Sequence, residues 1–383
     1  MLDNCETCGY PAHQNHFGVL TCQAWASFFG KPINNKTMQS VKRKIKSEAS
    51  DLFEPYNYGE PVGKKARLLV KKSNNPGIPK SMSRLLGRPA FLLFSSSLGS
   101  NYQSQKPNLK TILQFQHLIA KVDNILKTGT QKPYNKEMCS LEKISMGFEE
   151  LCGRKNDLKC ITNFTRDLRL SFFEQEFLTA AKWFGHFDEF RNLPVGIQLD
   201  IVKTSWMVFG RLNGLIRTAE FRRNQDFPSD QVFLVSAETY VDSKTTEIDV
   251  SWYTDHKREE VESFMSCFNN PNFDLVIREL IALRPTNTEL NFMLMNLCLQ
   301  QAEKKLPGSY AEIIDYLQSV LANQIHKHYT KQWKMPNYSG RLAKMMKINN
   351  LMKKDTWEMS EKMRLADLFD IFTLEFSNKE LLW

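Results

Sequence analysis

Residues 177–212 have the sequence FLTAAKWFGHFDEFRNLPVGIQLDIVKTSWMVFGRL and carry two helical apolar patterns with a turn signal between them. In and just before the first half, apolar residues recur every three or four positions, at Phe173, Phe177, Ala180, Phe184 and Phe187. After the turn at Leu193–Pro194 the same spacing returns at Leu199, Val202, Trp206, Phe209, Leu212 and Leu215. This spacing places each set on one helix face, so the stretch predicts two amphipathic helices joined by a turn.

Helical patterns continue on both sides of this stretch, from about Lys106 to the last residue. Two further helices are predicted where Thr286 precedes Glu289, and Ser309 precedes Glu312, at capping-box spacing. Residues 232–253, VFLVSAETYVDSKTTEIDVSWY, are rich in β-branched and aromatic residues around a polar centre, which predicts a β-hairpin. We therefore expect a mostly α fold over residues 106–383, a layered helical domain with one small hairpin.

The composition of the 383 residues excludes several classes of protein. Hydrophobic residues make up 42%, which is typical of a globular chain. No run of about 18 apolar residues occurs, which argues against a spanning helix, and the first residues, MLDNCETCGY, lack a signal-peptide pattern. We therefore expect an intracellular protein without a membrane partner. Gly-rich phosphate loops, nucleophile elbows and His-Glu-x-x-His motifs are also absent, so an enzyme is not expected.

The positive charge is concentrated in one region. The chain carries +9 overall, and residues 31–88 hold 14 basic residues against four acidic ones. Residues 31–72 form a basic segment, and residues 73–105, rich in Pro, Gly, Ser and Asn, are interpreted as a flexible linker. A basic block of this kind indicates proximity to nucleic acid or nuclear import.

Residues 1–30 contain an incomplete metal-binding pattern, Cys5-x2-Cys8-x13-Cys22-x2-Trp25. Two chelating cysteine pairs hold a tetrahedral zinc ion, but an indole ring at the fourth position cannot ligate it. Three interpretations are open. Water or His13 completes a three-cysteine site, or zinc binds weakly and the module folds in part, or the module no longer holds zinc.

The same segment resembles the first zinc module of nuclear hormone receptors. CETCGYPAHQNHFGVLTCQAWASFF follows the family pattern at nearly every position except the fourth cysteine, and the second module with its four cysteines is absent. The resemblance implies that the helix beginning near Cys22 enters the DNA major groove. The DNA-reading residues that it implies are Gln23, Ala24, Ala26, Ser27 and Lys31.

The helical part resembles the ligand-binding domain of nuclear hormone receptors, in the form found in the expanded nematode branch of the family. The matching positions are Trp183, Phe187, Phe190, Leu193, Gln198, Lys203 and Trp206. NYSGRLAKMM (337–346) resembles the family's helix 10, and LADLFDIFTLEFSNKELLW, at the end of the chain, resembles the nematode tail before and through the activation helix. The resemblance covers about residues 106–383 and implies the fold expected above.

A ligand pocket is predicted around Trp206, Asn213 and Arg217, which are spaced by seven and four residues and therefore share one helix face. In the family, an arginine eleven residues after this tryptophan contacts a polar ligand group. The hypothesis is that Arg217 anchors the polar head of a small apolar ligand. The alternative is an internal salt bridge, for instance to Glu220, or a side chain that reaches solvent along its apolar stem.

The resemblance also implies a groove for coactivator helices, with a lysine on one side and a glutamate of the last helix on the other. Lys203 occupies the second lysine position, and Gly185 replaces the first. Glu375 and Glu380 are both candidates for the acidic residue, although neither lies in the full family pattern. The alternative is that these are solvated charges.

The predicted function is therefore a nuclear-receptor-like transcription regulator in the nucleus. It would respond to a ligand, bind DNA weakly or through a partner, and recruit coregulator peptides. The alternative is an interaction protein that does not bind DNA, dimerises with itself or with other nuclear receptors, and titrates them. Zinc is the one cofactor that the resemblance implies.

Overall fold

The computed structural model describes residues 110–129, 134–135, 137–152, 158–224, 231–265, 270–335, 337–378 and 381, and the backbone of residues 14–16 and 19–21. The basic segment, the linker and the predicted DNA-reading residues lie outside the described residues, and so do Cys5, Cys8, Cys22, Trp25 and Glu380.

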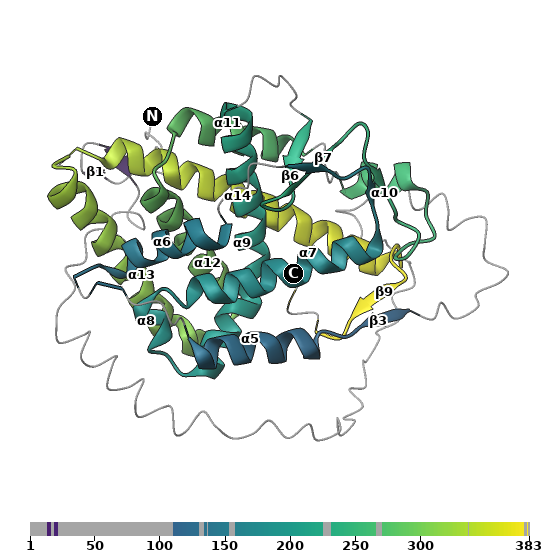
Figure 1. The fold of residues 1–383 in the computed structure, drawn as a ribbon, viewed down its shortest axis with the longest axis horizontal. Helices are drawn as coiled ribbons and strands as arrows, with labels where there is room; N and C mark the ends of the chain where they lie inside the picture. Colours follow the sequence, from purple (N-terminus) through teal and green to yellow (C-terminus); the bar gives the residue numbers. More distant parts are fainter. Residues whose placement is uncertain are drawn as a thin grey trace, which may run out of the picture. The chain divides into compact units, whose positions relative to one another are not determined.

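Helices make up most of the described chain from residue 110 onward (Figure 1). They are α5 (Gln116–Thr128), α6 (Ser140–Cys152), α7 (Arg166–Phe184), α8 (Asp188–Arg191), α9 (Val195–Asn224), α10 (Arg258–Met265), α11 (Pro271–Leu283), α12 (Asn287–Lys305), α13 (Ala311–Lys327) and α14 (Ser339–Leu368). A 3-10 turn (Gly308–Tyr310) precedes α13 and a π turn (His328–Gln332) follows it. The predicted mostly α fold is confirmed. None of the described helices is long and apolar enough to cross a membrane.

Helices α9 and α12 form the centre of the layered bundle. Helix α9 packs against α5 and α7 and also against α11 and α14, while α12 packs against α6 and against α13 and α14. Because its neighbours cover several sides, α12 buries every residue from Glu289 to Leu299. Residues 177–212 thus form the second half of α7, the short α8 and the first part of α9, with the predicted turn at Leu193–Pro194 between α8 and α9.

Side-chain caps mark the starts of α7 and α12. The Thr165 side chain accepts a hydrogen bond from the backbone of α7, and Thr286 and Glu289 form the predicted capping box of α12. The second predicted box is wrong. Helix α13 begins one residue after the 3-10 turn that contains Ser309, and Tyr310 is its N-cap, without a side-chain hydrogen bond. The 3-10 turn takes the place of the cap.

The predicted hairpin is present but shorter than its sequence pattern. Strands β6 (Val232–Leu234) and β7 (Thr239–Asp242) pair in antiparallel register, and β7 also pairs in parallel with β4 (Lys159–Cys160). Strand β8 (Glu247–Ile248) pairs instead with β5 (Asn163–Phe164). The second half of the β-rich stretch therefore attaches to the segment before α7, a long-range pairing that local pattern cannot reveal.

The chain after α14 is extended rather than helical over residues 371–378. Strand β9 (Leu374–Phe376) pairs in parallel with β3 (Thr111–Leu113), and Lys110 forms ion pairs with Asp370 at 3.0 Å and Glu375 at 3.5 Å. The resemblance led us to expect the activation helix in this tail. Glu375 lies on β9, so it is not in a helix here, and Leu381 lies in a 3-10 turn. The activation helix itself stays a prediction, because Glu380 lies outside the described residues.

Candidate ligand cavity

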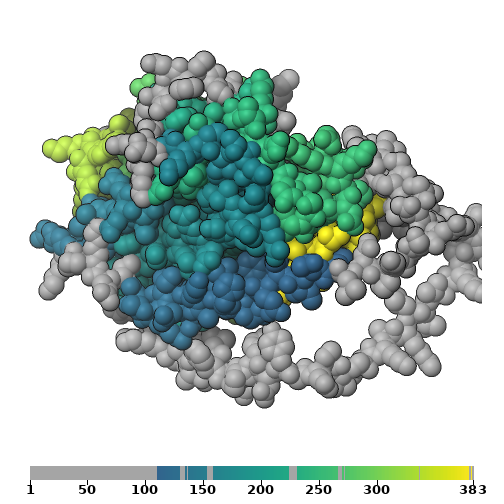
Figure 2. Space-filling model, turned by 45° about the vertical axis from the view of Figure 1, so that its right-hand side comes forward, coloured from purple at the N-terminus to yellow at the C-terminus, as the bar shows by residue number. Residues whose placement is uncertain are grey.

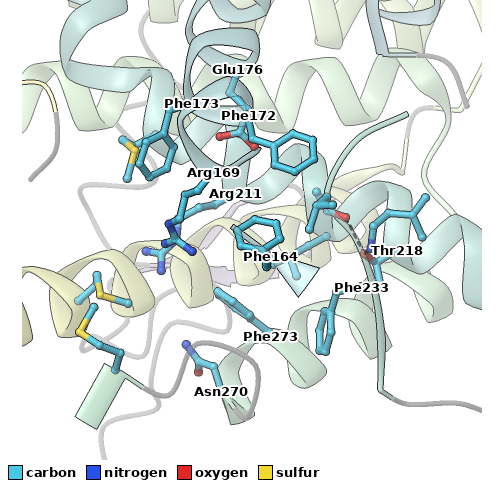
Figure 3. Close-up of a pocket in the computed structure, with 18 residues that line it drawn as sticks. Phe164, Arg169, Phe172, Phe173, Glu176, Arg211, Thr218, Phe233, Asn270 and Phe273 are labelled. Carbon is cyan, nitrogen blue, oxygen red and sulfur yellow. Dashed lines mark hydrogen bonds between the residues drawn. The ribbon is translucent and has the colours of Figure 1, made fainter. Parts of the chain in front are cut away.

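A cavity of about 290 Å³ lies between α7, α9, β6, α11 and α14 (Figure 3). Most of its wall is apolar, supplied by Phe164, Phe172, Phe173, Met207, Leu215, Phe233, Leu234, Val235, Met265, Phe273 and Met359. The polar side chains on it are Arg169, Glu176, Arg211, Thr218 and Asn270. A few polar groups in an apolar wall are typical of small-molecule sites.

Aromatic rings and methionines give the cavity its shape. Phe164, next to α7 in the chain, stacks on Phe172 with ring centroids 5.7 Å apart and planes inclined by 15°. On the other side the Arg222 guanidinium lies 5.0 Å from the ring centroid of Phe233. Rigid rings fix the width of such a cavity, and flexible methionine side chains adapt to the surface of an apolar guest.

Most polar groups at the cavity already have partners. Arg211 forms an ion pair with Asp355 at 3.0 Å, and the amide of Asn270 donates to the same carboxylate at 2.5 Å. The Thr218 hydroxyl donates to the Gly214 carbonyl at 2.8 Å and accepts from the Leu234 amide at 3.0 Å. These groups therefore tie α9, β6, α11 and α14 together at the cavity wall.

Glu176 differs from them, because it has no hydrogen bond or ion pair with any described residue. Its carboxyl faces the cavity near Arg169 and Arg211 (Figure 3). Burial raises the pKa of this carboxyl to about 7, and the positive charges of Arg217, Arg169 and Arg211 oppose that rise. Near neutral pH the group can therefore both donate and accept a hydrogen bond from a guest.

The Glu176 carboxyl lies directly over a glycine of α9, Gly210. A Cβ atom at Gly210 would lie 2.6 Å from Glu176 Oε2, closer than a real contact allows. One turn later, a Cβ at Gly214 would lie 3.6 Å from the Leu234 carbonyl oxygen, an ordinary van der Waals distance. Both glycines line the cavity, and a side chain at position 210 would displace the Glu176 carboxyl from its present position.

The three residues predicted to form the pocket are buried next to the cavity, and none of them is among its lining residues. Trp206 is 1% exposed, and its ring centroid lies 5.4 Å from that of Phe177 and 5.9 Å from that of Phe173. Its indole N–H donates to the carbonyl of Leu381 at 2.7 Å. Trp206 therefore holds the end of the C-terminal tail.

Asn213 and Arg217 lie together at the Cys152 thiol. The amide of Asn213 donates to Cys152 Sγ at 3.5 Å. Burial lowers the pKa of the Arg217 guanidinium, and the nearby Cys152, Glu176 and Glu220 oppose this effect. Arg217 lies close enough to Glu176 for its positive charge to lower the pKa of that carboxyl, which faces the cavity. The role of Arg217 as a ligand anchor stays a prediction.

The residues predicted for the coactivator groove have separate partners in the structure. Lys203 pairs with Asp200 at 3.4 Å, and the same carboxylate accepts the Tyr310 hydroxyl at 2.6 Å. Glu375 lies on β9 beside Lys110. The groove stays a prediction for both residues.

The incomplete metal pattern falls outside the described residues, except for a short hairpin between its cysteines. Strands β1 (Gln14–His16) and β2 (Val19–Thr21) pair in antiparallel register, with Gln14 opposite Thr21. Within the part of the chain that the structure describes, no group of three His, Cys, Asp or Glu side chains is placed to hold a metal ion.

Sequence reasoning did not single out Glu176 or Arg169. A signal for Glu176 was present, since it lies three residues after Phe173 and four before Ala180, within the apolar stripe. A carboxyl at core spacing indicates a buried acid or a cavity wall. Arg169 carried no comparable signal, because its position between aromatic rings depends on β5.

Two family models match the chain. Residues 154–369 match the ligand-binding domain of nuclear hormone receptor, and residues 3–50 match the double treble clef zinc finger of C4 type. The chain is 33% identical to nuclear hormone receptor family member nhr-130 of Caenorhabditis elegans, over 99% of this chain and 91% of the relative. It is also 33% identical to family member nhr-133 of the same organism, over 98% of this chain and 97% of the relative.

The two relatives align with almost the whole chain, and the zinc-finger match precedes the ligand-binding-domain match. The observed fold is the helical one that the ligand-binding-domain model implies. Members of the family are transcription factors and not enzymes. The chain therefore belongs to the nuclear hormone receptor family.

Proposed function

We propose that this chain is a ligand-responsive regulator of transcription that acts in the nucleus. The observation that carries the proposal is the cavity of about 290 Å³, with its aromatic wall and the carboxyl of Glu176 facing inward. An apolar molecule with one polar group fits this chemistry, because its body would contact the phenylalanine rings while the polar group meets Glu176 and Arg169.

Contact with DNA is proposed to be impaired or dependent on a partner. The match to the zinc-finger family supports a DNA-contacting origin, and the 14 basic residues within 31–88 suit phosphate contacts. Trp25 occupies the position of the fourth zinc ligand, so the surrounding helix that would read DNA bases lacks one of the four ligands that normally hold it in place.

Zinc would be held by the thiolates of Cys5, Cys8 and Cys22, which supply three of the four ligands of a structural site. The β1–β2 hairpin supports this arrangement, because Gln14 pairs with Thr21 and the chain returns on itself between the two cysteine groups. The ion would supply folding energy to the module and no chemistry of its own.

The second candidate function is an interaction protein that dimerises and titrates other receptors. Exposed apolar side chains on and before α14 favour it, with Trp357 53% exposed and Trp333 40% exposed. Zinc content and duplex binding discriminate the two functions. Stoichiometric zinc with a preference for one duplex sequence supports the regulator. Binding that is uniform across sequences and collapses with salt shows only the basic segment in contact, and a lack of duplex binding supports the titrating protein.

A pair of substitutions at Gly214 tests the ligand cavity. Gly214→Met is expected to fill the cavity beside Leu234, whereas Gly214→Ala adds only a Cβ at an ordinary contact distance. Full-length protein incubated with an animal-cell lipid extract would be analysed by native mass spectrometry. We expect a small-molecule adduct on the wild type and on Gly214→Ala, and its loss on Gly214→Met. Equal adducts on all three chains, or none on any, would contradict the proposal.

A further inference from the structure

Helix α5 packs against both α7 and α9 and buries one of its own faces there. Leu118, Val122 and Leu126 are 4%, 0% and 6% exposed, and the half-buried Ile119 and Ile125 pack on the same core. Figure 2 shows the blue residues of α5 at the surface, beside the teal residues of α7. The helix therefore binds the bundle through an apolar ridge and turns its polar residues outward.

A single face of α7 lies beneath α5. Lys121 of α5 pairs with Glu174 of α7 at 2.6 Å, which identifies the side of α7 that α5 covers. Residues four, seven and eleven positions further along a helix lie on the same side, and here these are Leu178, Ala181 and Gly185. The first of the three is half-buried and the other two are buried, as expected for a covered face.

The covered face coincides with the groove that the sequence predicts for coactivator helices. Gly185, at the end of this face, occupies the position of the first groove lysine. The C-cap of α5, Gly129, lies near the next helix, because a Cβ added there would be 3.9 Å from Arg191 Cδ in α8. Helix α9, which carries the second lysine position at Lys203, is the other helix under α5. Where the groove is predicted, the structure therefore holds one of the chain's own helices.

Helix α5 depends on the bundle for its form. It has 13 residues, a length that is marginal for a helix in water, and its N-cap Phe115 makes no side-chain hydrogen bond to it. One hydrogen bond, from Phe115 N to Ser377 Oγ at 3.2 Å, ties its start to the tail. Because apolar contact provides most of the remaining hold, another helix with the spacing of Val122, Ile125 and Leu126 suits the same surface.

We propose that α5 is a built-in competitor that covers a helix-binding groove between α7 and α9. A partner helix with the same apolar spacing binds this groove only when α5 leaves it. That the partner is a coregulator peptide rests on the proposed function, whereas the competition itself rests on the contacts of α5. Because α5 is tethered beside the groove, its effective concentration there is on the order of millimolar, so a free helix is excluded until α5 is weakened.

A free peptide with the sequence of residues 114–129, QFQHLIAKVDNILKTG, tests the competition. Labelled with fluorescein, it would be titrated into the full-length chain and followed by fluorescence anisotropy. Val122→Asp places a charge on the buried face of α5 and displaces the helix, so this variant should bind the peptide at least about tenfold more tightly than the wild type does. Asn124→Asp adds the same charge on the exposed side of α5 and should bind like the wild type.

Two further comparisons make the result decisive. Equal binding of the peptide to all three chains, or no binding to a folded Val122→Asp chain, would overturn the inference. If Val122→Asp does not fold, the milder pair Leu126→Ala on the buried side and Asn124→Ala on the exposed side decides, and only the first should bind the peptide more tightly than the wild type. No small ligand or DNA enters these titrations, so their failure is distinct from a failure of the cavity test at Gly214.

Discussion

A carboxyl group among phenylalanine rings is costly to ionise, and Glu176 of α7 is in that position. Its pKa of about 7 lies above the ordinary value of 4.5. Between these two values the folded chain keeps a proton that the unfolded chain has released. The free energy of unfolding contributed by this group therefore falls as the pH rises through that window.

We predict that Glu176→Gln removes this pH dependence. Relative to the wild type, the variant should gain about 1.4 kcal/mol of unfolding free energy per pH unit inside the window, or on the order of 3 kcal/mol in total. Urea unfolding of the full chain at several pH values would measure it. Glu174→Gln, on the outer face where Glu174 pairs with Lys121 at 2.6 Å, is the control and should follow the wild-type slope. A Glu176→Gln curve parallel to the wild type would refute the prediction.

For single residues, the spacing of the family pattern identified buried positions on α9 but not the polar groups that face the cavity, Glu176 and Arg169. Spacing on α9 correctly placed Trp206, Asn213 and Arg217 on one face, but that face meets Cys152 and the tail. Which face of a buried helix meets a cavity depends on the neighbouring elements. Only the structure brings β5, β6 and α11 to the other face of α9.

The C-terminal tail, from Ile371 onward, is held in place by hydrogen bonds from residues far away in the sequence. Trp206 of α9 donates to the Leu381 carbonyl at 2.7 Å, and Thr254 donates to the Ile371 carbonyl at 2.6 Å. Together with the β3–β9 pairing, these bonds hold residues 371–376 and Leu381 against the helical bundle. The position of the tail should therefore depend on each of them.

We predict that Trp206→Phe loosens the tail without loosening the rest of the bundle. The Leu381 carbonyl loses its buried donor, which typically costs about 1–3 kcal/mol locally. Hydrogen exchange at residues 374–381 should therefore speed up. Trp183→Phe is the matched control, because Trp183 also donates a buried hydrogen bond, to Asn291 at 2.8 Å in α12. Tail exchange that is unchanged in Trp206→Phe, or equally raised in Trp183→Phe, would argue against this role.

Elements coded by local signals were predicted, and elements built by distant pairing were not. The capping box at Thr286 and the antiparallel β6–β7 pair depend on residues close in sequence, and both are present. Strand β9 pairs with β3 more than 260 residues away, as the bond from Phe115 N to Ser377 Oγ also illustrates with its separation of 262 positions. Pairing of Leu374–Phe376 with β3 could not be read from the tail sequence, because the partner strand lies at the other end of the domain.

For the molecule as a whole, charge and metal ligands separate the two functions proposed above. The excess of +9 arises from residues 31–88, while three cysteines and Trp25 precede that block. Phosphate contacts need only the lysines and arginines, whereas a base-reading helix needs a folded module. The wild type is therefore expected to bind duplexes with little sequence preference and with a steep loss of affinity as salt rises.

Restoring the fourth ligand tests this expectation directly. Trp25→Cys completes the pattern Cys-x2-Cys…Cys-x2-Cys, so the variant should keep one zinc ion per chain through a chelator challenge that strips the wild type. Zinc would be counted by elemental analysis, and duplex binding measured across a salt series. Trp357→Cys adds a thiol at an exposed position of α14 and controls for thiol content. If the wild type already holds zinc as firmly as Trp25→Cys, then a fourth ligand such as His13 or water completes the native site, and impaired DNA reading loses its physical basis.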